Sequence, residues 1–331
     1  MMNPSLLTFL IFLLICSNTF AQNVSSKEAK EFKTRSLIVG LEEMNPKKIK
    51  KLKPKELEYC KSQIEGNNYA LKTAVEKYWK FNSTVEFLPL SEAKKLLKNK
   101  ANEYALLSFL KYKDYEHFRS GAGWSKGPNN YTTSTQWSPA LTYNSGTHYT
   151  TAANEIMTIN IDMPSTIFSV NLPNLYVSLP DAVYGIKQME YVFNRLIEND
   201  KLNFRDILKE GSGNTLKDKT LLLCKNDLDK KLDEEEIKNI YPYKYKIVTI
   251  EEIDKAIIDQ DNECVIVQIV SVKGGKGNVS IHYLSDTSTG RIVGYVVPTI
   301  ALRVKGTKLI TYNEKIKEKH LKEYLEIANC K

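Results

Sequence analysis

Two stretches of the chain carry one pattern, FLPLSEAKKLLKNKANEYALLSFLKYK at residues 87–113 and IVTIEEIDKAIIDQDNECVIVQIVSVK at residues 247–273. They align without a gap at an offset of 160 residues, and six apolar positions coincide. The identical pairs are Glu92/Glu252, Lys95/Lys255, Asn102/Asn262, Glu103/Glu263 and Lys113/Lys273. Each stretch has the periodicity of a strand, a helix and a second strand, and repetition of this burial pattern indicates an internal duplication.

The match extends beyond these stretches. Apolar runs typical of buried strands precede them, SLIVGL at 36–41 and TLLLCK at 220–225. Charged segments with helical character follow these runs. Downstream, residues 158–173 parallel residues 280–298, because in both of them two strand-like runs flank a polar turn.

Each copy then ends in an amphipathic helix, whose apolar stripe we interpret as core packing. The stripes consist of Val183, Ile186, Met189, Phe193, Leu196 and Ile197 in the first copy, and of Ile316, Leu321, Tyr324, Leu325 and Ala328, capped by Asn313, in the second. The sequence therefore predicts a mixed α/β (α+β) fold of two tandem β-α-β-α-β-β units, each followed by a strand and an amphipathic helix. With Gly211-Ser212-Gly213-Asn214 as the linker, the units span residues 22–210 and 211–331.

This order of elements resembles the α/β domains at the N-terminus of TolB-type proteins and in the CsgG-like family of envelope proteins. A hairpin of the form Asp-x-x-x-Gly joins two strands in those domains, and Asp286 and Gly290 match it. The first copy departs from that form, with Asp162-Met163-Pro164-Ser165-Thr166. The resemblance implies the fold, a place in the cell envelope and action through protein contacts, and it says nothing of a catalytic activity.

The N-terminus predicts export. The apolar run SLLTFLIFLLI at 5–15 is too short to span a bilayer, which takes about 20 residues. Thr19 and Ala21 are small residues placed for a signal peptidase, so we expect residues 1–21 to be a signal peptide, cleaved after Ala21, and the protein to be periplasmic or secreted. Ile15 argues against a lipid anchor on Cys16, and no later segment is apolar for long enough to cross a membrane.

The chain is basic, with 47 Lys and Arg against 39 Asp and Glu and a formal net charge of +8. An exported protein of this charge can adhere to anionic envelope polymers or lipid headgroups, whereas nucleic acid is not an expected partner outside the cell. We interpret the densest basic run, KKIKKLK at 47–53, as one solvated helix face, because it lacks the interleaved aromatic residues of a base-stacking surface.

Signal cleavage leaves four cysteines, Cys60, Cys224, Cys264 and Cys330. An even number in an oxidising compartment permits disulfides with three possible pairings. Cys224 and Cys264 lie in apolar strand-like runs, where a free cysteine also packs as a small hydrophobic residue, so the pairing stays open. No metal site or cofactor is expected, because no two cysteines are closely spaced and no histidine accompanies them.

The copies differ most in one connection. Between the matched residues Lys113 and Asn154 lie 40 residues, and between Lys273 and Asn278 lie four. We therefore predict a long hairpin insertion at 114–152 in the first unit. Its aromatic residues are candidate binding residues, because rings stack on sugars and peptides: Trp124, Tyr131, Trp137, Tyr143 and Tyr149. The alternative is that these rings cover an exposed sheet edge.

Catalytic motifs lack their structural context. Gly123-Trp124-Ser125-Lys126-Gly127 fits G-x-S-x-G, but no buried strand precedes Ser125 and no helix follows it. KGGKGN at 273–278 is expected to form a tight hairpin turn rather than a phosphate loop. The acidic run from Asp227 to Glu236 is typical of a helix start. The histidines, at 117, 148, 282 and 320, are scattered, and surface or structural roles are expected for them.

These observations predict a non-catalytic exported protein that acts through protein or glycan contacts. One alternative is an envelope hydrolase whose catalytic residues come together from distant parts of the chain. Another is a small-ligand binder that uses the cleft between the two units.

Overall fold

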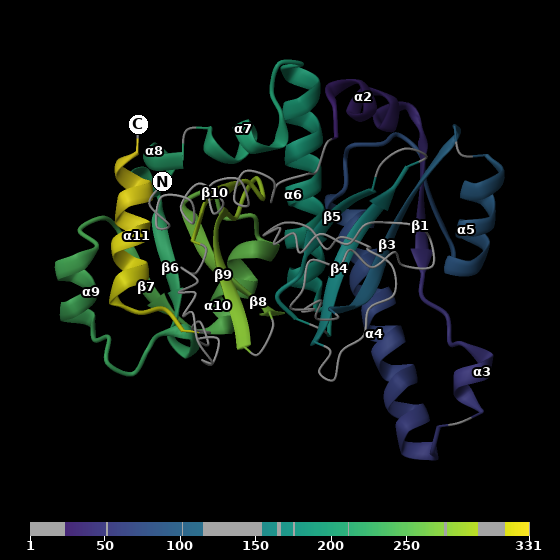
Figure 1. Ribbon diagram of the computed structural model, residues 1–331, viewed down its shortest axis with the longest axis horizontal. Coiled ribbons are helices and arrows are strands. Elements are labelled where there is room, and N and C mark those ends of the chain that lie inside the picture. Colours follow the sequence, from purple (N-terminus) through teal and green to yellow (C-terminus); the bar gives the residue numbers. More distant parts are fainter. Residues whose placement is uncertain are drawn as a thin grey trace, which may run out of the picture.

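The computed structural model describes residues 24–330 except 51, 101, 115–153, 164–166, 175, 211, 275–276 and 297–314. It shows a mixed α/β fold with two five-stranded sheets, which confirms the predicted class (Figure 1). The first unit contains α2 (Ser26–Thr34), β1 (Ser36–Leu41), α3 (Pro46–Ile49), α4 (Pro54–Tyr78), β2 (Val85–Pro89), α5 (Leu90–Asn99), β3 (Tyr104–Asp114), β4 (Asn154–Asp162), β5 (Ile167–Asn171) and α6 (Leu179–Glu198).

The second unit follows through α7 (Phe204–Lys209). It contains α8 (Ser212–Asp218), β6 (Thr220–Cys224), the short 3-10 helix η1 (Lys225–Asp227), α9 (Glu234–Ile240), β7 (Tyr245–Val248), α10 (Ile250–Ile258), β8 (Cys264–Gly274), β9 (Gly277–Asp286), β10 (Ile292–Val296) and α11 (Glu318–Asn329). The order of helices and strands is thus the same in both units, and each first strand is preceded by a helix that the sequence analysis did not anticipate.

Both sheets have the same strand order and the same register, apart from a bulge in β10 between Ile292 and Gly294. The first runs β2-β1-β3-β4-β5 and the second β7-β6-β8-β9-β10, with parallel pairs among the first three strands and antiparallel pairs after them. Tyr104 pairs with Ser36, and Cys264, which lies 160 residues later, pairs with Thr220 in the same way. The alignment found in the sequence is therefore a structural equivalence.

The connection between β3 and β4 and the one between β8 and β9 differ in length, and they begin and end at equivalent positions of the two sheets. The pairing of β3 with β4 ends at Asp114 opposite Asn154, and that of β8 with β9 ends at Gly274 opposite Gly277. The second pair confirms the predicted tight turn at 273–278. In the first unit the connection comprises residues 115–153, which lie outside the described residues. The insertion in the first unit thus leaves the sheet where the second unit has only a two-residue turn.

Two local predictions are wrong near the second unit. Of the expected linker at 211–214, the described residues Ser212, Gly213 and Asn214 belong to α8, and Gly213 packs so closely on the end of α11 that a Cβ there would lie 2.2 Å from the carbonyl oxygen of Cys330. The N-cap of α11 is Lys317 rather than Asn313. Ile316 is held extended before the helix, because its N–H donates to the carbonyl of Asp227 at 2.7 Å.

The sequence suggested that the basic run at 47–53 forms one helix face, and this prediction is wrong. The short helix α3 ends at Ile49, and α4 begins only at Pro54. Proline disfavours helical geometry in the residue before it but fits the first position of a helix, so Pro54 separates the two segments. Lys47 and Lys48 therefore lie in α3, and Lys50 and Lys53 lie between the two helices.

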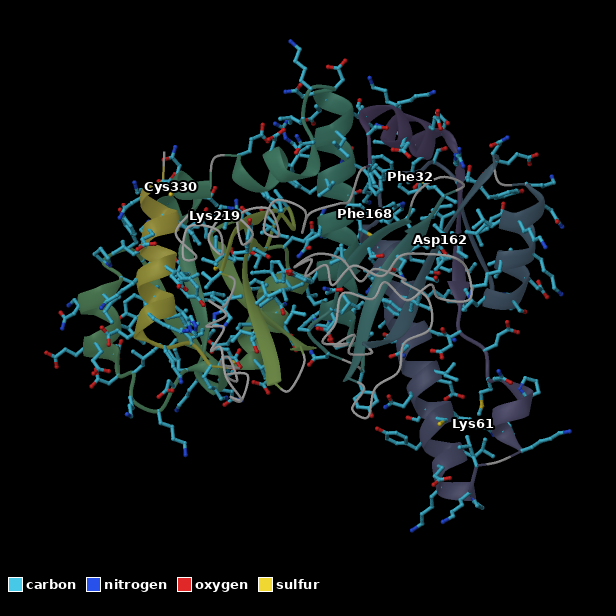
Figure 2. All side chains as sticks on the ribbon, viewed as in Figure 1. Phe32, Lys61, Asp162, Phe168, Lys219 and Cys330 are labelled. Carbon is cyan, nitrogen blue, oxygen red and sulfur yellow. The ribbon has the colours of Figure 1, made fainter. Side chains whose placement is uncertain are left out.

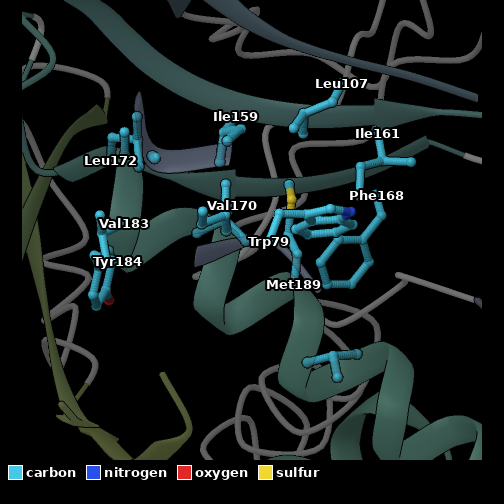
Figure 3. Packing of buried hydrophobic residues seen from close by; sticks show 14 of the residues in the cluster. Trp79, Leu107, Ile159, Ile161, Phe168, Val170, Leu172, Val183, Tyr184 and Met189 are labelled. Atoms are coloured by element: carbon cyan, nitrogen blue, oxygen red, sulfur yellow. The ribbon is translucent and has the colours of Figure 1, made fainter. Parts of the chain in front are cut away.

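Each sheet has helices on both faces. In the first sheet α2, α4 and α6 pack on the face that carries Leu107, Ile159 and Phe168, and Figure 3 shows these side chains turned toward α6. Helix α5 packs on the opposite face, against Ile38 and Leu106. In the second sheet α8, α9 and α11 cover one face, and α10 lies on the other.

Helix α6 joins the two units. It stands between the sheets (Figure 1), and one buried apolar cluster continues from Ile159 in the first sheet to Ile281 and Tyr283 in the second. On this helix the Tyr184 hydroxyl accepts a hydrogen bond from Ser285 Oγ at 3.5 Å. The second unit is therefore docked through α10 and the matching face of its sheet onto a helix of the first.

The turn between β9 and β10 fixes this docking. Gly290 has φ +73°, and a Cβ on it would lie 2.5 Å from the backbone carbon of Lys187 and 2.6 Å from the backbone nitrogen of Gln188, both in α6. Asp286 shapes the turn by accepting from the N–H of Ser288 at 2.9 Å, and it forms an ion pair with Lys219. The Asp-x-x-x-Gly hairpin is thus part of the contact between the units, together with α10 and the sheet face.

Among the described residues, no helix combines the length and the apolar character that crossing a bilayer requires.

Candidate contact surface

A row of polar side chains crosses the face of the first sheet that carries α5, which we call the α5 face. Ser108, Asn160 and Ser169 stand directly opposite one another on β3, β4 and β5. Side chains alternate along a strand, so these three share the α5 face while their neighbours enter the core. All three are buried, Asn160 and Ser169 to 1% exposure. We call them the polar row.

Two further polar side chains extend the polar row. Asp162 lies on β4 opposite Leu106, near α5, and burial raises the pKa of its carboxyl although Lys94 of α5 opposes this shift. Asn171 at the end of β5 is buried, and within the described part of the chain its Oδ1 has no hydrogen-bond partner. Buried polar atoms nearly always find partners. On the α5 face, Asn171 thus offers one buried acceptor that no hydrogen bond of the described chain uses.

The equivalent face of the second sheet has a different chemistry. The row equivalent to Ser108, Asn160 and Ser169 consists of Gln268, Tyr283 and Tyr295. Tyr283 is 4% exposed and belongs to the cluster that packs around α6 and α10, and Tyr295 packs against that cluster. Two aromatic rings thus replace an asparagine and a serine at matched positions.

The difference follows from the order of the units. Helix α6 of the first unit packs against the second sheet, on the face that is equivalent to the α5 face. That face must be apolar to bury the helix. No equivalent unit precedes the first sheet in the described chain, and α5 reaches only the part of its face near Ile38 and Leu106. In the second sheet this face docks on α6. The equivalent α5 face of the first sheet carries polar side chains instead.

The predicted binding residues do not lie on described parts of the chain. Trp124, Tyr131, Trp137, Tyr143 and Tyr149 fall within 115–153, as does Ser125. The polar row itself was missed by sequence reasoning. Its signal was present as the alternation of Asn160 with Ile159 and Ile161, and of Ser169 with Phe168 and Val170, which marks one apolar and one polar face.

Two histidines that are distant in the sequence meet in the second unit. The rings of His282 on β9 and His320 on α11 lie 4.4 Å apart, and Tyr324 OH lies 2.5 Å from Nδ1 of His282. His320 Nδ1 accepts from the N–H of Lys317 at 3.1 Å. Burial, together with the nearby His282, lowers the pKa of His320 to about 3, so this ring is neutral. The pair has the structural role that was one of the two expected.

The cysteines are free, because the structure forms no disulfide among Cys60, Cys224, Cys264 and Cys330. Cys224 and Cys264 are buried, as expected for small apolar residues. Within the described ranges no group of three or more histidine, cysteine, aspartate or glutamate residues is placed to hold a metal ion. The acidic run opens α9 through reciprocal capping by Asp233 and Glu236, which confirms its interpretation as a helix start.

The contact between the units encloses little space in its described part. A cavity of about 20 Å³ lies where β5, α6 and α7 meet Gly290 and Ile292. This volume suits about one water molecule, and ligand pockets measure hundreds of Å³. The described contact between the units therefore gives no support to a small-ligand site there.

No protein-family model, curated protein or solved structure matches this chain. The resemblance to the TolB-type and CsgG-like domains stays a prediction.

Proposed function

We propose that the protein is exported, that it is not an enzyme, and that it acts in the cell envelope or outside the cell through contacts with protein or glycan. The observation that supports this most is the divergence of two copies of one scaffold. They share strand order and register, yet they differ in the chemistry of one sheet face and in the connection between two strands of that sheet. Divergence of a sheet face and of a connection on a shared scaffold is expected of a binding function.

The connection 115–153 joins β3 and β4, which carry two of the three residues of the polar row, and we propose that the row and the connection form one contact region. Serine and asparagine offer both donors and acceptors, which match sugar hydroxyls and peptide groups. The predicted aromatic residues of the connection, such as Trp124 and Trp137, would add stacking area. Because the row is polar, a binding partner can come and go at this face without apolar surface becoming exposed to water.

The buried thiols and imidazoles support a role without catalysis. Burial raises the pKa of Cys264 to about 11 and that of Cys224 above its usual value, so neither is a thiolate at neutral pH. His282 and His320 are 1% and 4% exposed and pack between β9 and α11. A substrate in solution does not reach either ring.

The test replaces residues 115–153 by Gly-Lys, the two residues that stand between Gly274 and Gly277 in the second unit. The equivalent strand ends make this exchange geometrically matched. A companion variant keeps the connection and carries Trp124→Ala and Trp137→Ala. Binding to envelope glycans and in-cell cross-linking to envelope proteins are measured for both variants and for the parent chain, with thermal unfolding as the control for folding.

We expect both variants to unfold near the temperature of the parent and to lose at least tenfold in glycan binding or cross-linking yield. Unchanged binding in a folded exchange variant would contradict the proposed contact region. Unfolding of the first unit in the exchange variant, with normal binding in the tryptophan variant, would show that the connection covers a sheet edge instead.

A further inference from the structure

The first unit has a projecting arm that the second lacks. We define the arm as α3 together with the first half of α4, residues 46–66. The buried residues of α4 begin only at Asn67, so the 13 residues from Pro54 to Gly66 form a stretch of about 20 Å that leaves the body of the protein (Figure 1). Its counterpart α9 has seven residues.

The arm concentrates positive charge. It contains seven lysines and three glutamates, which amounts to half of the net charge of +8 in 21 residues. Lys50, Lys53, Lys55 and Lys61 are exposed, and Figure 2 labels Lys61 on the projecting helix. Among the described residues none of these four ammonium groups has a carboxylate within ion-pair distance. The equivalent segment of the second unit is acidic from Asp227 to Glu236, so the shared scaffold does not require this charge.

Aromatic and apolar side chains accompany the lysines. Tyr59 on the arm and Tyr176 after β5 are each 53% exposed, and their rings meet edge to face with centroids 6.0 Å apart. Ile49, Leu52 and Leu57 are only half-buried. The two tyrosines therefore meet each other and stay more than half exposed beside the lysines.

We propose that the arm is a docking surface for a bilayer that contains anionic lipids, and that it holds the protein at the face of a membrane. Each lysine brought to such a bilayer strengthens binding about fivefold, and several act together. Tyrosine rings prefer the level of the lipid headgroups. This mixture fits a lipid surface, because the headgroups meet the lysines and the boundary between headgroups and acyl chains meets the tyrosines and the half-buried aliphatic groups.

The test measures co-sedimentation of the full chain with two kinds of vesicle, phosphatidylcholine alone and phosphatidylcholine with 30% phosphatidylglycerol. The arm variant carries Lys50→Glu, Lys53→Glu and Lys55→Glu. The matched control carries Lys230→Glu, Lys231→Glu and Lys238→Glu, which change the net charge equally on exposed positions of the second unit. Binding to phosphatidylcholine alone reports the apolar run at 5–15, which both variants retain.

The parent chain is expected to bind anionic vesicles at least tenfold more tightly than neutral ones, and less tightly as salt rises. The arm variant should lose about 100-fold of this binding and the control variant less than fivefold, both with parental thermal unfolding. Adding Tyr59→Ser to the parent should weaken binding a few-fold. Equal losses in the two triple variants would overturn the proposal, as would capture by a soluble polyanion through the same lysines without binding to vesicles.

Discussion

At Gly290 the absence of a side chain decides how closely the second unit approaches the first. The backbone there is left-handed, a conformation that costs other residues about 1–2 kcal/mol, and the backbone of α6 occupies the place of a Cβ. Gly66 in α4 offers a contrast, because a Cβ there would meet nothing within 4 Å. A substitution at Gly290 therefore tests the contact between the units, whereas a substitution at Gly66 tests only helix propensity.

We expect Gly290→Ala to lower the free energy of unfolding by about 2–4 kcal/mol, the sum of backbone strain and a steric clash with backbone that cannot move aside. Gly66→Ala should raise it by about 0.5–1 kcal/mol, because alanine favours a helix interior. Urea denaturation measures both. A Gly290→Ala variant as stable as its parent would show that the hairpin does not dock on α6.

His320 provides a pH test of the packing between β9 and α11. Its pKa is about 3 when folded and about 6.5 when unfolded, so the unfolded chain binds more protons in that interval. The stability that depends on the neutral ring is complete above pH 6.5 and is lost as the pH falls toward 3. Between pH 7 and pH 5 the loss should be about 2 kcal/mol.

The variant His320→Phe should lack this dependence, while the other three histidines remain as an internal control. Urea denaturation at pH 7 and pH 5 gives the comparison. If parent and variant lose the same stability over that range, His320 is not buried in the neutral form.

At the scale of elements, the strands and their order could be predicted because apolar runs of strand length occur twice at a constant offset. Helix boundaries were less accessible. Lys317 rather than Asn313 caps α11, since hydrogen bonds between Ile316 and the segment after β6 decide where that helix begins. Such contacts join parts of the chain that are distant in the sequence, and local propensity does not contain them.

For the candidate surface, too, local patterns predict one part and contacts between distant parts of the chain decide the rest. The alternation along β4 and β5 predicts that one face is polar, but not that α6 covers the equivalent face of the second sheet. That fact depends on the docking of Gly290, which no periodicity reveals. The contact of His282 with His320 likewise needs the packing of α11 on its sheet. The arm was visible as a basic run, yet only the burial of α4 from Asn67 onward shows that it projects.

At the scale of the whole molecule, the two copies of the scaffold differ in the features that we propose to bind partners. The second unit is docked on α6, has a tight turn between β8 and β9, and lacks the basic arm. The first carries the polar row, the connection 115–153 and the arm of residues 46–66. The proposed contacts with partner and membrane thus belong to the first unit, and the second supports α6 from the other side.

The central claim is that the chain consists of two copies of one scaffold. Crystallographic structure determination of the protein tests it most directly, through superposition of residues 87–113 on 247–273. We expect the strands and the helix to coincide, with Tyr104 beside Ser36 as Cys264 is beside Thr220. Two sheets with different strand orders, or a pairing of Tyr104 and Cys264 with residues other than Ser36 and Thr220, would contradict the duplication and with it the assignment of the contact surface.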